Sequence, residues 1–167
     1  MMNSSVSRPK DIELVQPPTD SVSKIEFSPT QDILAVASWD NNVSLSLGPD
    51  WTALILMNQV RLYEVNSQGQ SQPKAMYSHE APVLDLCWSK VSDGNVALAD
   101  DQSGTQLISA GCDNAARCYD TVTGQSTQVA AHDGPIKCVR WVDMPNGSGE
   151  NGVLVTAGWD KKLKVSS

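Results

Sequence analysis

A short pattern that recurs three times along the chain limits the folds it can adopt. The copies read ILAVASWD, QLISAGCD and VLVTAGWD, and they end at Asp40, Asp113 and Asp160. Each copy is an apolar run followed by two small residues, one variable residue and the aspartate. Ahead of each copy, a segment that alternates apolar and other residues leads to an aromatic, and such alternation is typical of a half-buried strand. The sequence therefore predicts a strand-rich unit that is repeated.

The middle copy displays the unit most completely. Residues 106–111 and 115–119 read as two strands joined by a tight turn at Cys112, Asp113 and Asn114, which is a common hairpin signal. His79 and His132 stand before the second and third copies, and the first copy has Asp20 at that place. Four strands, an opening His and an Asp in a hairpin turn are the features of a propeller blade. We predict an all-β fold, a partial β-propeller of about two and a half four-stranded antiparallel blades.

The repeat also predicts the boundaries of the blades. We expect an N-terminal tail over residues 1–19 with a short strand at 11–15, which in a closed ring pairs within the last blade. Blade one then covers 20–78, blade two 79–131, and an incomplete blade three 132–167.

Two segments interrupt the repeat, and both start and end alike. Removing 43–59 from blade one brings Tyr63 into register with Tyr119, and removing 91–102 does the same for the strands of blade two. Both segments begin with Val-Ser, which GTAAGT can encode, and end with Gln, which CAG encodes. The chain switches to Val-Ser again at Val165, so we hypothesise translated introns and a truncated form. The alternative is that both segments are natural surface loops, which propellers accept easily.

Composition narrows the function classes. The net charge of −7 argues against a chain that grips bare phosphate backbones by electrostatics. Four cysteines without a C-x-x-C pair are expected to be buried reduced thiols rather than a zinc site, and no metal or cofactor is expected. Residues 1–10 lack the apolar core of a secretory signal, and 43–59 is too short to span a bilayer, so we expect an intracellular protein with no membrane contact.

One set of polar residues admits two interpretations. The residues His79, Ser109 and Asp113, with His132, Thr156 and Asp160 as their counterparts, have the chemical types of a hydrolase triad. The chain has no strained nucleophile turn such as G-x-S-x-G. In a blade the same residue types form a buried hydrogen-bond chain that ties a loop to the hairpin turn. We favour this structural role, with Asp40 as the equivalent turn residue of the first copy, and expect no enzyme.

Lys161, Lys162 and Lys164 form a small basic cluster, with Lys137 and Arg140 placed more loosely nearby. Such a cluster either meets RNA phosphates or is a solvated strand end. Because the chain is acidic overall, we expect RNA binding to be weak or indirect.

Longer runs carry a resemblance to a known family. The segments SVSKIEFSPTQDILAVASWDNN, VRLYEVNSQGQ, QVAAHDGPIKCVRWV and TAGWDKKLK resemble the WD-repeat factors of messenger-RNA export at the nuclear pore. A close relative of these factors is the mitotic-checkpoint WD-repeat adaptor of kinetochores. The likeness covers residues 11–164 apart from the two insertions, although Tyr63-Glu64 and Tyr119-Asp120 replace the Trp-Asp pair typical of the family.

The resemblance implies a non-catalytic scaffold that binds the GLEBS-type peptide of an FG-repeat nucleoporin and supports nuclear export of polyadenylated messenger RNA. It implies a location in the nucleus at the nuclear pore complex, and also in the cytoplasm, with checkpoint-kinase peptides as further partners. The family's contacts come from exposed turn residues next to the repeated Asp, which here are Trp39 and Trp159. The alternative for both residues is an indole that packs between the rims of adjacent blades. The alternatives are a kinetochore spindle-checkpoint adaptor and a non-functional truncated translation product.

Overall fold

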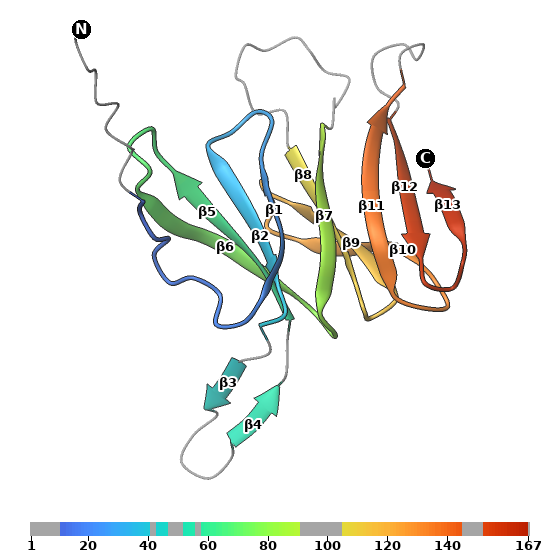
Figure 1. Cartoon of the computed structure of the whole chain (residues 1–167), viewed down its shortest axis with the longest axis horizontal. Coiled ribbons are helices and arrows are strands. Elements are labelled where there is room, and N and C mark those ends of the chain that lie inside the picture. Colours follow the sequence, from blue (N-terminus) through green and yellow to red (C-terminus); the bar gives the residue numbers. More distant parts are fainter. Residues whose placement is uncertain are drawn as a thin grey trace, which may run out of the picture.

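In a computed structural model, the described residues form three antiparallel sheets of three or four strands, which follow one another from left to right in Figure 1. The structure describes residues 11–40, 43–46, 52–55, 58–90, 105–144 and 152–166. The first sheet has the order β1 (Val22–Phe27), β2 (Ile33–Ser38), β5 (Asn58–Val65) and β6 (Ser71–His79). The second has β7 (Val83–Lys90), β8 (Thr105–Gly111), β9 (Ala115–Asp120) and β10 (Ser126–Ala131). The third has β11 (Ile136–Asp143), β12 (Gly152–Gly158) and β13 (Leu163–Ser166).

The described residues contain no helix, so the prediction of an all-β, partial propeller is confirmed. The three sheets have the same register. Their first two strands pair Phe27 with Leu34, Trp88 with Leu107 and Trp141 with Leu154. The next strand then places Tyr63 opposite Leu34 and Tyr119 opposite Leu107. The three copies of the sequence pattern thus occupy equivalent places in three sheets.

The first inserted segment adds a separate hairpin. Strands β3 (Val43–Ser46) and β4 (Thr52–Ile55) pair only with each other and project beyond the sheets (Figure 1). The last two residues of this segment, Asn58 and Gln59, belong to β5 and pair with His79 and Ser78 of β6. The second segment, 91–102, lies outside the described residues.

Residues 11–16 form no strand, contrary to the expectation for 11–15. They lie against the outer face of the first sheet, where Leu14 packs beside the buried Tyr63. The Tyr63 hydroxyl donates to the Gln16 carbonyl oxygen at 2.8 Å. The segment is therefore held by side chains rather than by a ladder, and the following Pro17 and Pro18 cannot donate to one.

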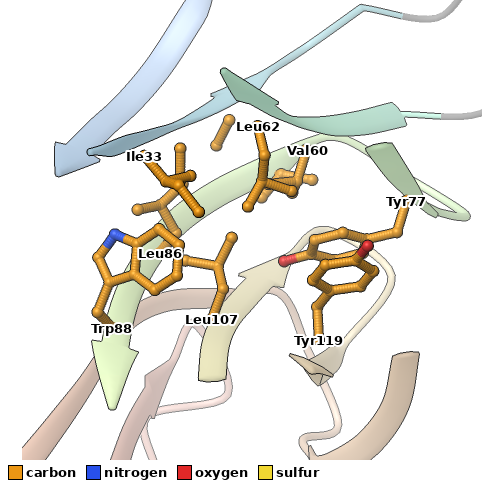
Figure 2. Close-up of a cluster of buried hydrophobic side chains, with 11 residues drawn as sticks. Ile33, Val60, Leu62, Tyr77, Leu86, Trp88, Leu107 and Tyr119 are labelled. Atoms are coloured by element: carbon orange, nitrogen blue, oxygen red, sulfur yellow. The ribbon is translucent and has the colours of Figure 1, made fainter. Parts of the chain in front are cut away.

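Two apolar cores join the sheets in sequence. Between the first and second sheets, Ile33, Val60 and Leu62 meet Leu86, Trp88 and Leu107 (Figure 2). The Tyr77 ring of β6 stacks on the Tyr119 ring of β9 with centroids 4.7 Å apart (Figure 2). Between the second and third sheets, the core includes Ile108, Cys118, Val139 and Leu154.

The second sheet is thus apolar on both faces, because alternate residues of its strands point to opposite sides. Burial of each large side chain stabilises the fold by roughly 1.5–3 kcal/mol. Contacts between sheets therefore contribute to the stability of this fold, as in other repeat architectures.

Polar contacts between neighbouring sheets fix how they stack. The carboxylate of Asp85 on β7 accepts from the Val139 backbone N–H at 3.0 Å and from the Arg140 guanidinium at 2.7 Å, both on β11. One sheet earlier, the Trp88 indole N–H donates to the Glu26 carbonyl oxygen at 3.1 Å. The first strand of each later sheet is bonded to the sheet before it.

None of the four cysteines, all of which are described, is in a disulfide. Cys87 and Cys118 are buried, and burial raises the pKa of Cys87 to about 12 and that of Cys118 to about 11. These two thiols are therefore protonated and unreactive at neutral pH.

Candidate partner-binding edge

The turns that follow β2, β8 and β12 form one structural series, which we call the turn edge; it comprises residues 39–40, 112–114 and 159–161. In each turn, one backbone N–H donates to the loop that precedes the first strand of the sheet. The bonds join Trp39 to Ser21 at 2.9 Å, Cys112 to Pro82 at 2.8 Å and Trp159 to Pro135 at 2.8 Å. The residue before the repeated Asp is thus held by the same backbone bond in all three sheets.

Two of these anchored positions carry exposed indoles. Trp39 is 47% exposed and Trp159 is 62% exposed. A large aromatic on a fixed backbone presents much apolar area and loses little entropy on binding. The middle turn has the half-buried Cys112 instead, so it offers less surface.

In the second sheet, a chain of four side chains supports the turn. The Asp113 carboxylate lies 2.9 Å from His79 Nδ1, and His79 Nε2 lies 2.7 Å from Ser109 Oγ. The Tyr77 hydroxyl lies 2.7 Å from the same oxygen. All atoms are satisfied when Tyr77 donates to Ser109, Ser109 donates to His79 Nε2 and His79 Nδ1–H donates to Asp113; this assignment of hydrogens follows from the network.

The third sheet repeats most of this chain. His132 Nδ1 lies 3.0 Å from the Asp160 carboxylate, and His132 Nε2 lies 3.0 Å from Thr156 Oγ1. The backbone N–H of Lys162 also donates to Asp160, at 3.1 Å. The residues that the sequence analysis grouped as a hydrogen-bond chain are therefore in contact in the second and third sheets.

The first sheet holds its turn in another way. Asp40 is fully buried and accepts from the Thr19 hydroxyl at 2.6 Å, from the Thr19 backbone N–H at 3.0 Å and from the Arg61 guanidinium at 2.7 Å. Pro18 occupies the position equivalent to His79, because Pro18 stands four residues before Val22 and His79 four residues before the equivalent Val83. The sequence comparison had placed Asp20 at this position. Proline has no side-chain donor, so Thr19 and Arg61 supply the bonds.

Two consistent sequence signals marked this difference. Val36 stands where the second sheet has Ser109, so the first copy lacks both the histidine and the hydroxyl of this chain. Tyr77 was missed because it lies on a strand outside the repeated pattern. Arg61 was missed although it has a counterpart, since Arg117 lies opposite Ser109 as Arg61 lies opposite Val36 and is 3.8 Å from Asp113.

The turn aspartates are held as carboxylates. Burial would raise the pKa of Asp113, but hydrogen bonds from His79 and from backbone N–H groups outweigh burial and lower it. The same balance, with His132 as donor, lowers the pKa of Asp160 to about 2. For Asp40, burial is outweighed by the bonds from Thr19 and Arg61, and the pKa is again lowered.

The chain of Asp113, His79 and Ser109 has the connectivity of a hydrolase triad, but its hydroxyl is not accessible to a substrate. Ser109 is fully buried and His79 is 1% exposed, so no substrate carbonyl can approach the hydroxyl. The Ser109 oxygen also accepts from Tyr77, so it is already bonded on both sides. The arrangement can hold a turn in place, whereas nucleophilic catalysis needs an accessible nucleophile and an oxyanion site.

Three of the basic side chains discussed above form contacts within the protein. Lys162 forms an ion pair with Asp133, and the Lys164 ammonium donates to the Ala131 carbonyl oxygen at 2.6 Å. Arg140 pairs with Asp85 at 2.7 Å. These contacts engage three of the five basic side chains, Lys137, Arg140, Lys161, Lys162 and Lys164.

Within the described part of the chain, no group of His, Cys, Asp and Glu side chains is arranged to hold a metal ion. No helix in those same residues is long and apolar enough to cross a bilayer.

Comparison with known proteins identifies the repeat. The family model described as WD domain, G-beta repeat matches residues 12–45 and 124–165. The crystal structure of Sqt1 from Saccharomyces cerevisiae superimposes with a TM-score of 0.57 over 87% of this chain and 31% of that one, at 14% sequence identity. This second likeness concerns the fold alone.

Several relatives share sequence over most of this chain. Poly(A)+ RNA export protein of Schizosaccharomyces pombe is 39% identical over 93% of the chain, and mRNA export factor GLE2 of Chaetomium thermophilum is 36% identical over 92%. Protein Rae1 of Drosophila melanogaster is 36% identical over 96% of the chain. The chain spans 35% of the length of the first two relatives and 38% of the third.

Proposed function

This chain belongs to the WD-repeat family and is related to proteins named messenger-RNA export factors, and from this premise we propose that it is a non-catalytic docking platform in export of polyadenylated messenger RNA. The observation that carries the proposal is the pair of exposed indoles, Trp39 and Trp159, on equivalent anchored turns. Partner binding is the chemistry such a surface supports, because rigid aromatics at the surface act as interface anchors.

The partner in this proposal is a peptide of the GLEBS type from an FG-repeat nucleoporin, bound along the turn edge. The buried aspartates keep the turns in one conformation before the peptide arrives, which reduces the entropy cost of binding. The protein would then act at the nuclear pore complex. The net charge of −7 and the internal ion pairs of Lys162 and Arg140 favour a protein ligand over an RNA backbone.

The test is peptide affinity measured by fluorescence anisotropy with the variants Trp39→Ala and Trp159→Ala. A hot-spot aromatic costs about 2 kcal/mol or more on truncation, which corresponds to roughly thirtyfold weaker binding. Both indoles are exposed, so the folded state should survive, which circular dichroism checks. Val122→Ala is the matched control, since Val122 is 61% exposed but follows β9 at the other end of that strand. Unchanged affinity in both tryptophan variants would refute this use of the turn edge.

A further inference from the structure

The segment 43–59, which we call the insert, enters the fold at the first turn of the turn edge. Its hairpin of β3 and β4 follows Trp39 and Asp40 in the chain, pairs with no other described strand and projects beyond the sheets (Figure 1). The flanking strands β2 and β5 pair in the same register as their counterparts β8 and β9. Of the described residues of the insert, only Asn58 and Gln59 therefore belong to the first sheet.

Without the insert, the first turn would have the length of the other two. Equivalent pairs close the three hairpins: Ala37 with Val60, Ala110 with Ala116 and Ala157 with Leu163. The second and third pairs enclose the same number of residues. A chain in which Asn42 is joined to Val60 has that number in the first hairpin too.

A chain without the insert would also have a suitable residue at the one left-handed position of the turn. Asn114 and Lys161 occupy this position in the second and third turns, and both have a φ of 64°. Asparagine adopts such a φ more readily than most residues other than glycine. Asn41 would take the position of Asn114, so the shortened turn would need no strained residue.

The turn aspartate would gain a further donor. In the second and third turns, the backbone N–H two residues after the aspartate donates to its carboxylate. These bonds join Ala115 to Asp113 at 3.3 Å and Lys162 to Asp160 at 3.1 Å. With the insert removed, the N–H of Asn42 has this place and can donate to Asp40.

The end of the insert carries two buried oxygens that are not satisfied. Asn58 and Gln59 are 2% and 4% exposed, and Asn58 Oδ1 and Gln59 Oε1 have no hydrogen-bond partner in the described part of the chain. A buried polar atom without a partner lowers the stability of the folded state. Gln59 lies opposite Ser78 as Ala115 lies opposite Ala131, so the second sheet has an apolar residue at this place.

We propose that the insert is a separable element that weakens the turn edge: the chain without it closes its first turn as the second sheet does and holds Trp39 on a more stable turn. Chains with and without the insert then differ in partner binding. This consequence rests on the proposed function, because Trp39 is one of its two aromatic anchors. A turn that is more rigid before the peptide arrives binds it at a smaller entropy cost.

The experiment compares the full chain with a variant from which residues 43–59 are deleted. The urea midpoint of the deletion variant should be higher by about 0.5 M or more, because two unsatisfied buried oxygens are removed. Hydrogen exchange at the Trp39 amide should be slower by roughly tenfold or more, since that amide lies in the turn that becomes more stable. Peptide affinity, measured by fluorescence anisotropy, should increase by roughly fivefold or more.

Two substitutions in the deletion variant test the geometry of the turn. Asn41→Val should lower the urea midpoint, because a β-branched residue is strained at positive φ. Asn41→Gly is the matched control and should keep the midpoint, since glycine adopts this φ freely. Equal midpoints in the two substituted chains would contradict the assigned turn.

Gln59→Ala tests the end of the insert in the full chain, without a deletion. The urea midpoint should not fall, because Ala115 fills the equivalent place in the second sheet. A lower midpoint would show that Gln59 contributes to the fold and would overturn the proposal.

The proposal is also overturned if the deletion variant fails to fold, has a lower urea midpoint than the full chain or exchanges faster at the Trp39 amide. If the full chain binds the peptide and the deletion variant binds it no more tightly, the insert does not weaken the turn edge, although the proposed function stands. If neither chain binds the peptide, the proposed function fails, and the urea midpoint and the exchange rate still decide whether the insert weakens the turn.

Discussion

Replacing Ser109 with Ala removes the hydroxyl at the centre of the buried chain in the second sheet. That oxygen accepts from the Tyr77 hydroxyl and donates to His79 Nε2, both at 2.7 Å. Alanine fits the space but bonds neither group. The Tyr77 hydroxyl and the His79 ring nitrogen would then be buried without partners, since Tyr77 is 7% and His79 1% exposed.

The magnitude follows from counting the stranded groups. Each buried polar group left unsatisfied costs about 1–3 kcal/mol, so two give a loss of about 2–4 kcal/mol in the free energy of unfolding, allowing for partial relaxation. The matched control is Ser109→Thr, because Thr156 fills the equivalent place in the third sheet and bonds His132 at 3.0 Å. Threonine keeps the hydroxyl, so it should cost less than about half as much.

Urea unfolding followed by tryptophan fluorescence at low protein concentration measures both variants. The double variant His79→Leu with Ser109→Ala should cost less than the two single costs added together, since they remove the same bond. A loss below about 0.5 kcal/mol for Ser109→Ala, or an equal loss for Ser109→Thr, would contradict the assigned network.

Three further outcomes are expected. In Gly158→Ala, the new Cβ would lie 2.6 Å from both Asp160 Oδ1 and His132 Nδ1. The variant should therefore lower the free energy of unfolding, measured by urea titration, by about 1–3 kcal/mol. An unchanged free energy of unfolding would refute the close packing. At Asp160, hydrogen bonds outweigh burial and lower the carboxyl pKa from 3.8 to about 2 in the folded state. The ionised Asp160 therefore stabilises the folded state fully above pH 3.8, and this stabilisation is lost as the pH falls toward 2. In Asp160→Asn, the free energy of unfolding should depend less steeply on pH between 3.8 and 2 than in wild type. A pH dependence parallel to that of wild type would count against this assignment. If residues 43–59 and 91–102 are translated introns, sequencing mature messenger RNA should find transcripts without these codons; transcripts that always keep them favour natural loops.

The register between the strands of each sheet could be predicted from the sequence, because it depends on the local alternation of apolar and polar residues. Aligning the three aspartates placed Tyr63 and Tyr119 in equivalent positions across a long interruption, and both lie opposite the equivalent leucines Leu34 and Leu107. Alternation of apolar residues fixes which face of a strand is buried, and a shift of one residue would turn every side chain to the other face. Few registers satisfy that condition.

The supports of the turn edge were only partly predictable. His79, Ser109 and Asp113 share residue types with their counterparts in the third sheet, so comparison of letters brought them together. Thr19 donates to Asp40 where the other two sheets use a histidine, and no repeat reveals a substitution that is made only once. Arg61, in contrast, has a counterpart in Arg117, which lies 3.8 Å from Asp113.

The N-terminal segment shows another limit of sequence patterns. The apolar residues at 11–15 fit a strand, but Leu14 finds its place against the first sheet, a contact that depends on tertiary packing. Propensity alone does not decide between an edge strand and a packed irregular segment.

Hydrogen exchange at the backbone amides of Trp39, Cys112 and Trp159 tests the central claim most directly, because all three turns are held by the same bond to Ser21, Pro82 and Pro135. We predict protection at all three amides, well above that of an unstructured peptide. Exchange at the rate of an unstructured peptide at Trp39 or Trp159 would contradict the account, because the indole there would not stand on a fixed turn.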